Sequence, residues 1–463
     1  MNGFYQKLFP TTFVMAVCAL VFAVSCTKSV DLMADCHQES VVESQFSVSE
    51  TEAISMLSKD LDAIYGEGDR TRAASARRIK NIKGVKFNRA LSTRGASMPD
   101  DVSNLLYVVE FEDGQGSAVL GADKRVEPVF AILDRTVLTA EDIENAMSFD
   151  ADRNDLTPFV AGMIYSSAMS QLETNATALP PVDIKTTRYE TRYDTIGYEK
   201  KLPLLNTKWH QRDPFNMNYD YNSQYNSRYP AGCGVIAGTQ IMQYHQRPNP
   251  LVIDGQTFLW NSVNKFVYNS QVIPSDADSV ILGGFIYAVG KKMKMNQHVN
   301  ESIGLATGVA TDNAIKAFRG LGYTVSKELN YETSSIIIEI VNNRPVYTVG
   351  YTGNNLGHAW VIDGLLRYTV KEWLYEIETD PRKIPAGSDG VVNKTLVNTT
   401  SVGRLHCNYG WGGRCDGYYS YGVFDTSAYL ASEWVEKSDG DRLGKENYFF
   451  DRKLSYFTVN VVQ

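Results

Sequence analysis

The stretch GCGVIAGTQIMQYH, residues 232–245, decides how the middle of this chain folds. Glycines flank Cys233, and the apolar run after it ends before Pro248, because proline disfavours the helical conformation in the residue that precedes it. The pattern predicts a helix of about 13 residues that begins at the cysteine. The unpaired N–H groups and the dipole at such a helix start would lower the pKa of the thiol and make it a better nucleophile.

Small residues line one face of this helix. Gly234, Ala237 and Gly238 share a stripe with Ile241, so another element can approach closely, which would justify the cost of internal glycine in a helix. Taken alone, however, a free cysteine is more often an inert core thiol. Cys233 could act as a nucleophile only if another residue can take the proton of its thiol.

His358 is the candidate partner among six histidines. It lies in NLGHAWVIDG, residues 355–364, where a glycine precedes it and a hydrophobic strand follows, although a structural histidine is the simpler reading of that segment alone. Near the end, HCNYGWGGRCDGY, residues 406–418, puts Asn408 at the end of a strand, before a loop rich in glycine and aromatic residues. The order Cys, His, Asn is that of papain-type catalysis.

These segments resemble the streptopain family of bacterial papain-like cysteine peptidases. Residues 232–245 are similar to its nucleophile helix, 357–364 to its histidine strand and 408–419 to its asparagine loop. The segment 209–216 is similar to the one that carries its oxyanion glutamine, and 107–125 to a strand pair of its propeptide. The resemblance covers most of the chain beyond the N-terminal segment.

The resemblance implies roles for four residues. Cys233 would be the nucleophile and His358 the general base and acid, with Asn408 accepting the Nδ1–H of His358 so that Nε2 faces the sulfur. Gln211 would donate to the oxyanion together with the backbone N–H of Cys233. Tyr409 stands where the family has tryptophan, and with Trp411 it would shield the site. No metal or organic cofactor is implied.

About 40 residues separate Asp363 from Cys407, more than the family needs. They include residues 371–377 and the turn region 385–390, and we expect an extra hairpin beside the cleft. Cys407 and Cys415 have a spacing that allows a disulfide across a turn, and free thiols are an equal expectation. The cysteine pattern is neither a disulfide framework nor a zinc motif.

The N-terminus has the pattern of an export signal. Lys7 precedes an apolar run, residues 13–24, that is too short to span a bilayer comfortably. The sequence Ala23-Val-Ser-Cys26 resembles a bacterial lipoprotein box, although Ala23 stands where leucine is usual. We expect a signal peptide over 1–25 and a lipid-anchored tether over 26–46. Ordinary signal cleavage, with Cys26 as a bystander, is the alternative.

The remaining chain divides into two parts. A helix from about Ser49, a strand pair over 105–111 and 116–120, and helical pattern over 140–173 predict a small α+β domain at 47–180. By the resemblance it is an inhibitory pro-domain. Residues 181–201 have little apolar periodicity and predict an exposed linker where activation cleavage occurs, or else a loop within one larger domain.

Residues 202–463 are predicted to form a papain-like α+β domain, with helices over 231–247, 278–293 and 311–322. Strands are predicted over 345–351, 359–362, 371–377 and 451–462, which makes a helical half followed by an antiparallel half. The net charge of −8, with Lys and Arg dispersed, disfavours a nucleic-acid partner.

The expected function is that of an exported cysteine endopeptidase made as a zymogen. Its expected partners are protein or peptide substrates and its own pro-domain, with membrane contact only through the lipid. It would reside at an outer or cell-surface membrane, or be periplasmic or secreted after processing. A papain-like cell-wall amidase or endopeptidase, and a non-catalytic binding module on a decayed peptidase fold, are the alternatives.

Overall fold

A computed structural model describes most of the chain from residue 46 onward. The described residues are 46–65, 77–86, 101–146, 156–176, 188–267, 273–300, 304–351, 357–378, 384, 387–389, 391–424, 435–436, 442–443 and 452–461. The signal peptide and the tether, with Cys18, Cys26 and Cys36, lie outside these residues. Within them, none of the helices has the length and apolar character needed to cross a membrane.

Residues 46–176, as far as described, have the expected α+β composition; they form one compact unit with the C-terminal region and are called the N-terminal domain below. Ser49 caps its first helix, because the Ser49 hydroxyl accepts the N–H of Glu52 at 3.2 Å. The hairpin turns at Asp113 and Gly114, which both have positive φ angles. Its elements are α1 (Glu50–Tyr65), β1 (Ile79–Lys86), β2 (Asn104–Phe111), β3 (Ser117–Gly121), β4 (Val129–Leu133), α2 (Ala140–Ala146) and α3 (Leu156–Thr174).

The region from residue 202 has the expected helical half followed by an antiparallel half. The helices are α4 (Cys233–His245), α5 (Trp260–Val263), α6 (Asp276–Lys292), α7 (Thr311–Gly320) and α8 (Thr333–Val341). The strands that carry the argument below are β12 (Tyr323–Val325), β13 (Leu329–Asn330), β14 (Val346–Tyr351), β15 (Gly357–Ile377), β16 (Val391–Asn408), β17 (Gly417–Ser420) and β20 (Arg452–Val461). The predicted α+β fold class is confirmed.

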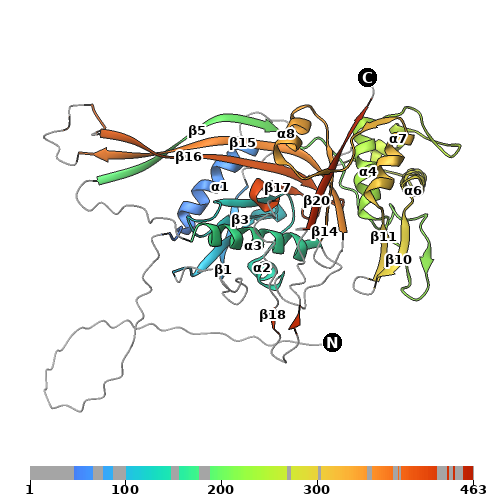
Figure 1. Cartoon of the computed structure of the whole chain (residues 1–463), viewed down its shortest axis with the longest axis horizontal. Coiled ribbons are helices and arrows are strands. Elements are labelled where there is room, and N and C mark those ends of the chain that lie inside the picture. The colour runs from blue at the N-terminus through green and yellow to red at the C-terminus, as the bar shows by residue number, and fades with distance from the viewer. Residues whose placement is uncertain are drawn as a thin grey trace, which may run out of the picture. The chain divides into compact units, whose positions relative to one another are not determined.

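One antiparallel sheet runs through both regions. Among the described strands its order is β1-β2-β3-β4-β17-β16-β15-β14-β20-β12, with β13 on β20 and β5 (Arg188–Lys201) on β15. The domains join where β4 pairs with β17, and Gly417 lies opposite Leu133 in that ladder. A Cβ on Gly417 would lie 2.4 Å from the carbonyl of Ile132, so glycine permits this close pairing. The N-terminal domain therefore extends the sheet that carries the C-terminal strands (Figure 1).

Three buried clusters hold the described residues together. One fills the helical half and unites α4, α5, α6 and α7 with side chains of β14, β15 and β20. Another combines α2 and α3 of the N-terminal domain with Leu365 and Leu405 of the C-terminal strands, and the third packs α1 on the opposite face of the same sheet. Two of the three clusters contain side chains of both the N-terminal domain and the C-terminal region. The hydrophobic effect therefore favours the association of these two parts of the chain.

The second part of the predicted linker, 181–201, is a long strand and not an irregular segment, although residues 193–198 are exposed as expected. β5 (Arg188–Lys201) pairs antiparallel with β15, from Leu365 opposite Lys201 to Ile377 opposite Arg188. The strand was missed because polar residues occupy both of its faces. Ion pairs between β5 and a neighbouring strand favour the pairing of these polar residues, for example the ion pair between Glu199 and Arg367 of β15.

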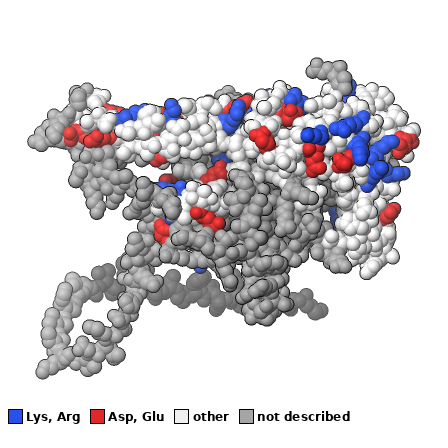
Figure 2. Space-filling view, viewed as in Figure 1, with Lys and Arg blue, Asp and Glu red and all other residues white. Residues whose placement is uncertain are grey.

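The insertion between Asp363 and Cys407 is a hairpin, as expected, but it runs away from the site instead of lying beside the cleft. β15 and β16 pair continuously from Val361 with Asn408 to Ile377 with Val391. Nineteen residues separate His358 from Ile377, which at about 3.3 Å per strand residue is roughly 60 Å. β5, β15 and β16 lie side by side at the left of Figure 1, and acidic and basic side chains are interspersed along them in Figure 2.

Candidate active site

Cys233 is the first residue of α4, where the sequence predicts it, and its side chain is half-buried. Gly232 before it has a φ of 89°, a left-handed conformation that glycine adopts without strain. A Cβ at Gly232 would also lie 2.6 Å from the carbonyl oxygen of Thr307. Glycine at this position therefore allows the chain to turn into the helix with the thiol at its N-terminal end.

The small residues of α4 do permit close packing. The Tyr347 hydroxyl of β14 donates to the carbonyl of Gly234 at 3.1 Å, and a Cβ on Gly234 would lie 2.7 Å from that hydroxyl. At Gly238 a Cβ would lie 2.4 Å from the methyl of Met293. The contact with Tyr347 therefore brings α4 close to β14, the neighbour of the strand that carries His358.

His358 lies at the start of β15 and is brought to Cys233. Burial raises the pKa of the Cys233 thiol, but the charge of His358 and hydrogen bonds from His358, Ala359 and Gly234 outweigh it. The pKa of Cys233 is therefore below its ordinary value. The backbone N–H of Ala359 donates to Sγ at 3.4 Å. The structure thus joins the two residues that the sequence analysis pairs.

The other ring nitrogen of His358 contacts backbone rather than an amide side chain. Nε2 lies 3.0 Å from the carbonyl oxygen of Tyr409, and because a carbonyl only accepts, Nε2 donates. Nδ1 is then the nitrogen left for Cys233. The expectation that Asn408 accepts the Nδ1–H of His358, with Nε2 facing the sulfur, is wrong.

Asn408 instead holds the peptide group that His358 contacts. Its Oδ1 accepts the N–H of Gly410 at 3.1 Å, and its Nδ2 donates to the carbonyl of Thr207 at 2.8 Å. The N–H of Gly410 and the carbonyl of Tyr409 belong to one planar peptide unit. Asn408 therefore fixes the orientation of the acceptor for His358 through that unit.

Aromatic rings surround His358. Tyr409, fully buried, stacks with the imidazole at a centroid distance of 6.0 Å, and Trp411 lies tilted at 6.0 Å. Trp360 stacks at 6.4 Å. The two aromatic residues named from the sequence thus lie against the ring.

Gln211 lies next to the start of α4. Its carbonyl accepts the N–H of Ala231 at 2.8 Å, two residues before Cys233. The side chain is 6% exposed, and its amide makes no hydrogen bond to any other residue that the structure describes. The segment of Gln211 is therefore held beside Cys233 while the side-chain amide keeps its hydrogen-bonding capacity.

Sequence reasoning missed a buried amide, Gln240, that connects these segments. It lies on α4 and hydrogen-bonds Thr207, Trp209 and Asn408. The available signal was its spacing, because a residue seven positions after Cys233 lies on the same face of a helix. A polar side chain on that face, inside an apolar run, marks a position that needs a partner.

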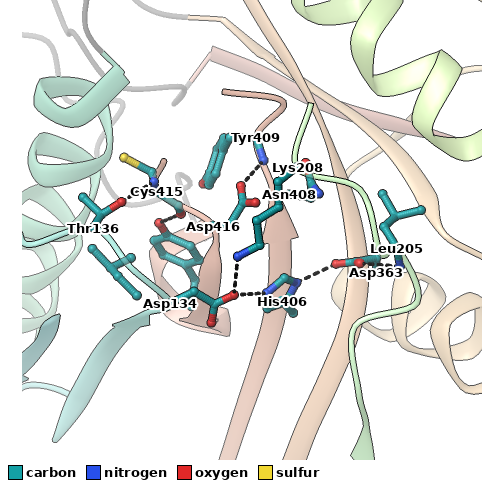
Figure 3. A network of polar contacts seen from close by, with 12 residues as sticks. Asp134, Thr136, Leu205, Lys208, Asp363, His406, Asn408, Tyr409, Cys415 and Asp416 are labelled. Carbon is teal, nitrogen blue, oxygen red and sulfur yellow. Dashed lines mark hydrogen bonds and ion pairs between the residues drawn. The ribbon is translucent and has the colours of Figure 1, made fainter. Parts of the chain in front are cut away.

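A buried charge network connects His406 of β16 with Asp363 and with Asp134 of the N-terminal domain (Figure 3). His406 Nδ1 lies 2.6 Å from Asp363 Oδ1, and its Nε2 lies 3.5 Å from Asp134 Oδ2 of the N-terminal domain. Burial lowers the pKa of His406, but the charge of Asp363 and the bonds to both carboxylates prevail and raise it to about 10. Burial raises the pKa of Asp134, but His406, Lys208 and Arg77 together lower it to about 2.

Asp416 supports the asparagine loop from the same side. Its carboxylate accepts the N–H of Tyr409 at 2.8 Å, and its carbonyl accepts the N–H of Asp134 at 2.9 Å. Burial raises the pKa of Asp416 to about 7, although the hydrogen bond from Tyr409 opposes that shift. Asp416 thus connects the backbone of Tyr409 with that of Asp134 in the N-terminal domain.

A pocket of about 590 Å³ lies beside Trp411 and is lined by residues of the N-terminal domain and of the C-terminal region. The segment 135–137 and Asp142 line it from the N-terminal domain, and His210 and the loop 411–414 line it from the other side. Since Trp411 also contacts His358, the N-terminal domain reaches the edge of the site.

The remaining cysteines of the described region, Cys407 and Cys415, are buried and do not form the disulfide that their spacing allows. Among the described residues no group of three or more His, Cys, Asp or Glu side chains is arranged to hold a metal ion.

Comparisons with known proteins give one family match and several similar solved structures. The model of the peptidase C10 family matches residues 209–419, a range that includes Gln211, Cys233, His358 and Asn408. A search of curated proteins gave no match. Among solved structures, a prointerpain A fragment of Prevotella intermedia is 14% identical over 81% of this chain and 97% of its own, with a TM-score of 0.48. Active interpain A of the same organism is 17% identical over 56% and 94%, with a TM-score of 0.34.

Proposed function

We propose that this chain is a cysteine-type peptidase that cleaves peptide bonds with Cys233 as nucleophile and His358 as general base and acid. Its residues 209–419 match the model of the peptidase C10 (streptopain) family. One observation carries the proposal. The sulfur at the N-terminus of α4 is hydrogen-bonded by His358 and, at 3.4 Å, by the Ala359 N–H, and these contacts lower the pKa of the thiol despite its burial. A thiolate held beside an imidazolium is the reactive form of such a pair.

The reaction then proceeds in two halves. The Cys233 thiolate attacks the substrate carbonyl carbon, and the oxyanion accepts hydrogen bonds from the Cys233 N–H and the Gln211 side chain. The C–N bond breaks as His358 gives its Nδ1 proton to the leaving amine, which leaves a thioester on Cys233. His358 next takes a proton from water, whose oxygen attacks the thioester, and the acid product leaves with the thiolate restored.

Asn408, Tyr409 and Trp411 support His358 in this proposal. Asn408 orients the Tyr409 carbonyl through the Gly410 N–H, and that carbonyl holds the imidazole with Nδ1 toward the sulfur. Tyr409 and Trp411 exclude water from the ring, which strengthens the hydrogen bonds made inside the site. These roles give the imidazole one orientation through both halves of the reaction.

We further propose that residues 47–180 are an inhibitory pro-domain. Its segment 135–137 lines the pocket beside Trp411, and its Asp134 pairs with His406. A second buried pair joins Asp60 of α1 to Arg404 of β16. These contacts support a domain that covers one side of the site until cleavage in the region 181–201 allows it to leave.

We also propose that the protein is exported and is anchored by a lipid on Cys26, because its N-terminus has the pattern of an export signal followed by a lipoprotein box. The protein would then act at an outer or cell-surface membrane, in the periplasm or outside the cell. Radiolabelled palmitate incorporation into the wild type but not into Cys26→Ser tests the anchor.

Substrate digestion and thiol labelling test the catalytic proposal. We expect the processed wild type to digest casein but not purified peptidoglycan, and Cys233→Ala to digest neither. A peptidyl epoxide should label Cys233 in the folded protein, whereas buried Cys407 and Cys415 serve as internal controls that label only after denaturation. Casein digestion by Cys233→Ala would remove Cys233 from its role, and peptidoglycan digestion would favour the amidase alternative.

A further inference from the structure

Gln240 is a buried amide of α4 whose hydrogen bonds reach two other segments of the site. It lies seven residues after Cys233 on α4, two turns along the same face, and its side chain is fully buried. Its Oε1 accepts from the Thr207 hydroxyl at 2.7 Å and from the Trp209 N–H at 3.4 Å. Its Nε2 donates to Asn408 Oδ1 at 3.0 Å. Because a backbone N–H only donates, the oxygen of Gln240 must face Trp209, and the orientation of the amide is defined.

The three partners of Gln240 belong to two different parts of the site. Thr207 and Trp209 precede Gln211 in the segment proposed to supply the oxyanion donor. Asn408 holds the peptide whose carbonyl contacts His358. A single side chain on the nucleophile helix therefore connects both parts to the helix that carries Cys233.

We propose that Gln240 is a positioning residue that fixes Cys233, the Gln211 segment and the backbone acceptor of His358 relative to one another. The inference rests on the proposed function, because it concerns how that site is held in its working geometry. It assigns to Gln240 no contact with the substrate.

The position requires an acceptor and a donor at once. Thr207 and Trp209 present hydrogens to Oε1, while Asn408 presents an oxygen to Nε2. A neutral carboxylic acid also offers one acceptor and one donor, but an ionised carboxylate only accepts. Ionised glutamate at position 240 would therefore repel Asn408 Oδ1 and release the peptide that holds His358, whereas protonated glutamate would restore the contact.

Gln243 supplies a matched control on the same helix. It is 2% exposed, and its Nε2 donates to the Oδ1 of an asparagine, Asn264, at 2.9 Å. Gln243→Glu thus breaks the same kind of buried amide contact, one turn further along, without touching Asn408. Loss of stability alone would affect the two glutamate variants alike.

The experiment compares kcat and KM of processed wild type, Gln240→Glu and Gln243→Glu with a peptide substrate between pH 5 and 8. We expect Gln240→Glu to lose about 10²-fold in kcat at pH 8 with KM little changed, since small displacements of catalytic groups have effects of that size. The ratio of its kcat to that of wild type should rise as pH falls, because burial raises the pKa of a glutamate and lets it take up a proton. Gln243→Glu should show a small, pH-independent loss.

Two results would overturn the inference: equal losses in both glutamate variants, or a Gln240→Glu ratio that does not change with pH. Melting temperatures of all three proteins, measured across the same pH range, ensure that each rate refers to folded enzyme. Cys233→Ala measured in parallel separates this failure from that of the proposed function. If Cys233→Ala is inactive while Gln240→Glu matches wild type, the catalytic proposal stands and only the role of Gln240 falls.

Discussion

The carbonyl oxygen of Tyr409 lies 3.0 Å from Nε2 of His358 and is the acceptor for the proton on that nitrogen. The side chain of Asn408 acts one step further back, on the N–H of Gly410. A backbone acceptor is independent of the identity of the side chain at position 409, so the tyrosine there is compatible with a working site. The backbone contact also means that the conformation of the loop after Asn408, and not one side-chain amide alone, determines the orientation of His358.

Asn408→Ala should therefore slow the enzyme without abolishing activity. The Tyr409 carbonyl would remain, but its peptide unit would lose the contact at Gly410, and buried groups of Thr207 and Gln240 would lose their partner. We expect kcat to fall by about 10²-fold with a smaller change in KM. Steady-state kinetics with a peptide substrate measure both, and unchanged kcat would contradict the relayed contact.

The reactivity of Cys233 should depend on His358. The pKa of the thiol is lowered below its ordinary value, so the thiolate persists to lower pH than in a free cysteine. In His358→Ala burial still raises that pKa while the largest opposing effect is gone. We expect alkylation of Cys233 by iodoacetamide at pH 7 to slow by about 10-fold or more, since the thiolate is the reacting species. Equal alkylation rates at pH 7 in wild type and variant would argue against the pair.

The pH dependence of stability should report the buried network at His406. Its folded-state pKa is raised to about 10, above the ordinary value of about 6.5. Its stabilisation is therefore fully present below pH about 6.5 and is lost as the pH rises through about 10. In a Cys233→Ala background, His406→Gln should lower the free energy of unfolding by about 3–5 kcal/mol at pH 6, because breaking a buried pair leaves a charge uncompensated.

Urea unfolding at pH 6, 8 and 10 measures this difference. It should shrink steadily from pH 6 to pH 10. A difference that stays constant over that range would mean that His406 is not held in its charged form.

The buried pair between Asp60 and Arg404 should matter far more than an exposed one. Both side chains are almost fully inaccessible, and Arg404 also donates to the carbonyl of Val129 at 2.8 Å. We expect Arg404→Met, in the Cys233→Ala background, to cost about 3–5 kcal/mol because Asp60 remains buried without its partner. Arg367→Met, which removes a half-exposed pair with Glu199, should cost at most about 1 kcal/mol. Urea unfolding compares the two, and similar losses would mean that the buried pair does not hold the domains together.

The sequence was sufficient where local pattern determines structure. The helix at Cys233 and the strand at His358 follow from glycine positions and apolar runs, and both lie where the patterns predict them. The hairpin at Asp113 and Gly114 and the capped helix after Ser49 are local in the same way.

Those local patterns could not predict polar contacts between residues that are far apart in the sequence. β5 is polar on both faces, and only its distant partner β15 makes it a strand. The orientation of Asn408 depends on Gly410, whose φ of 65° turns the loop toward α4. A Cβ at Gly410 would lie 2.8 Å from a methyl of Ile236, so this turn is fixed by tertiary packing and not by neighbours in sequence. The direct bond from Asn408 to His358 was inferred by resemblance, whereas Asn408 Oδ1 accepts from Gly410 and Gln240 instead.

The acyl-enzyme is the most direct test of the account. Wild-type protein, processed and mixed with a slowly deacylating peptide ester, should be quenched in acid within the first turnover and digested for mass spectrometry. We expect the acyl group on the peptide that contains Cys233 and on no other, with its formation strongly slowed in His358→Ala. An acyl group on another residue, or turnover with no covalent species on Cys233, would contradict the proposed mechanism.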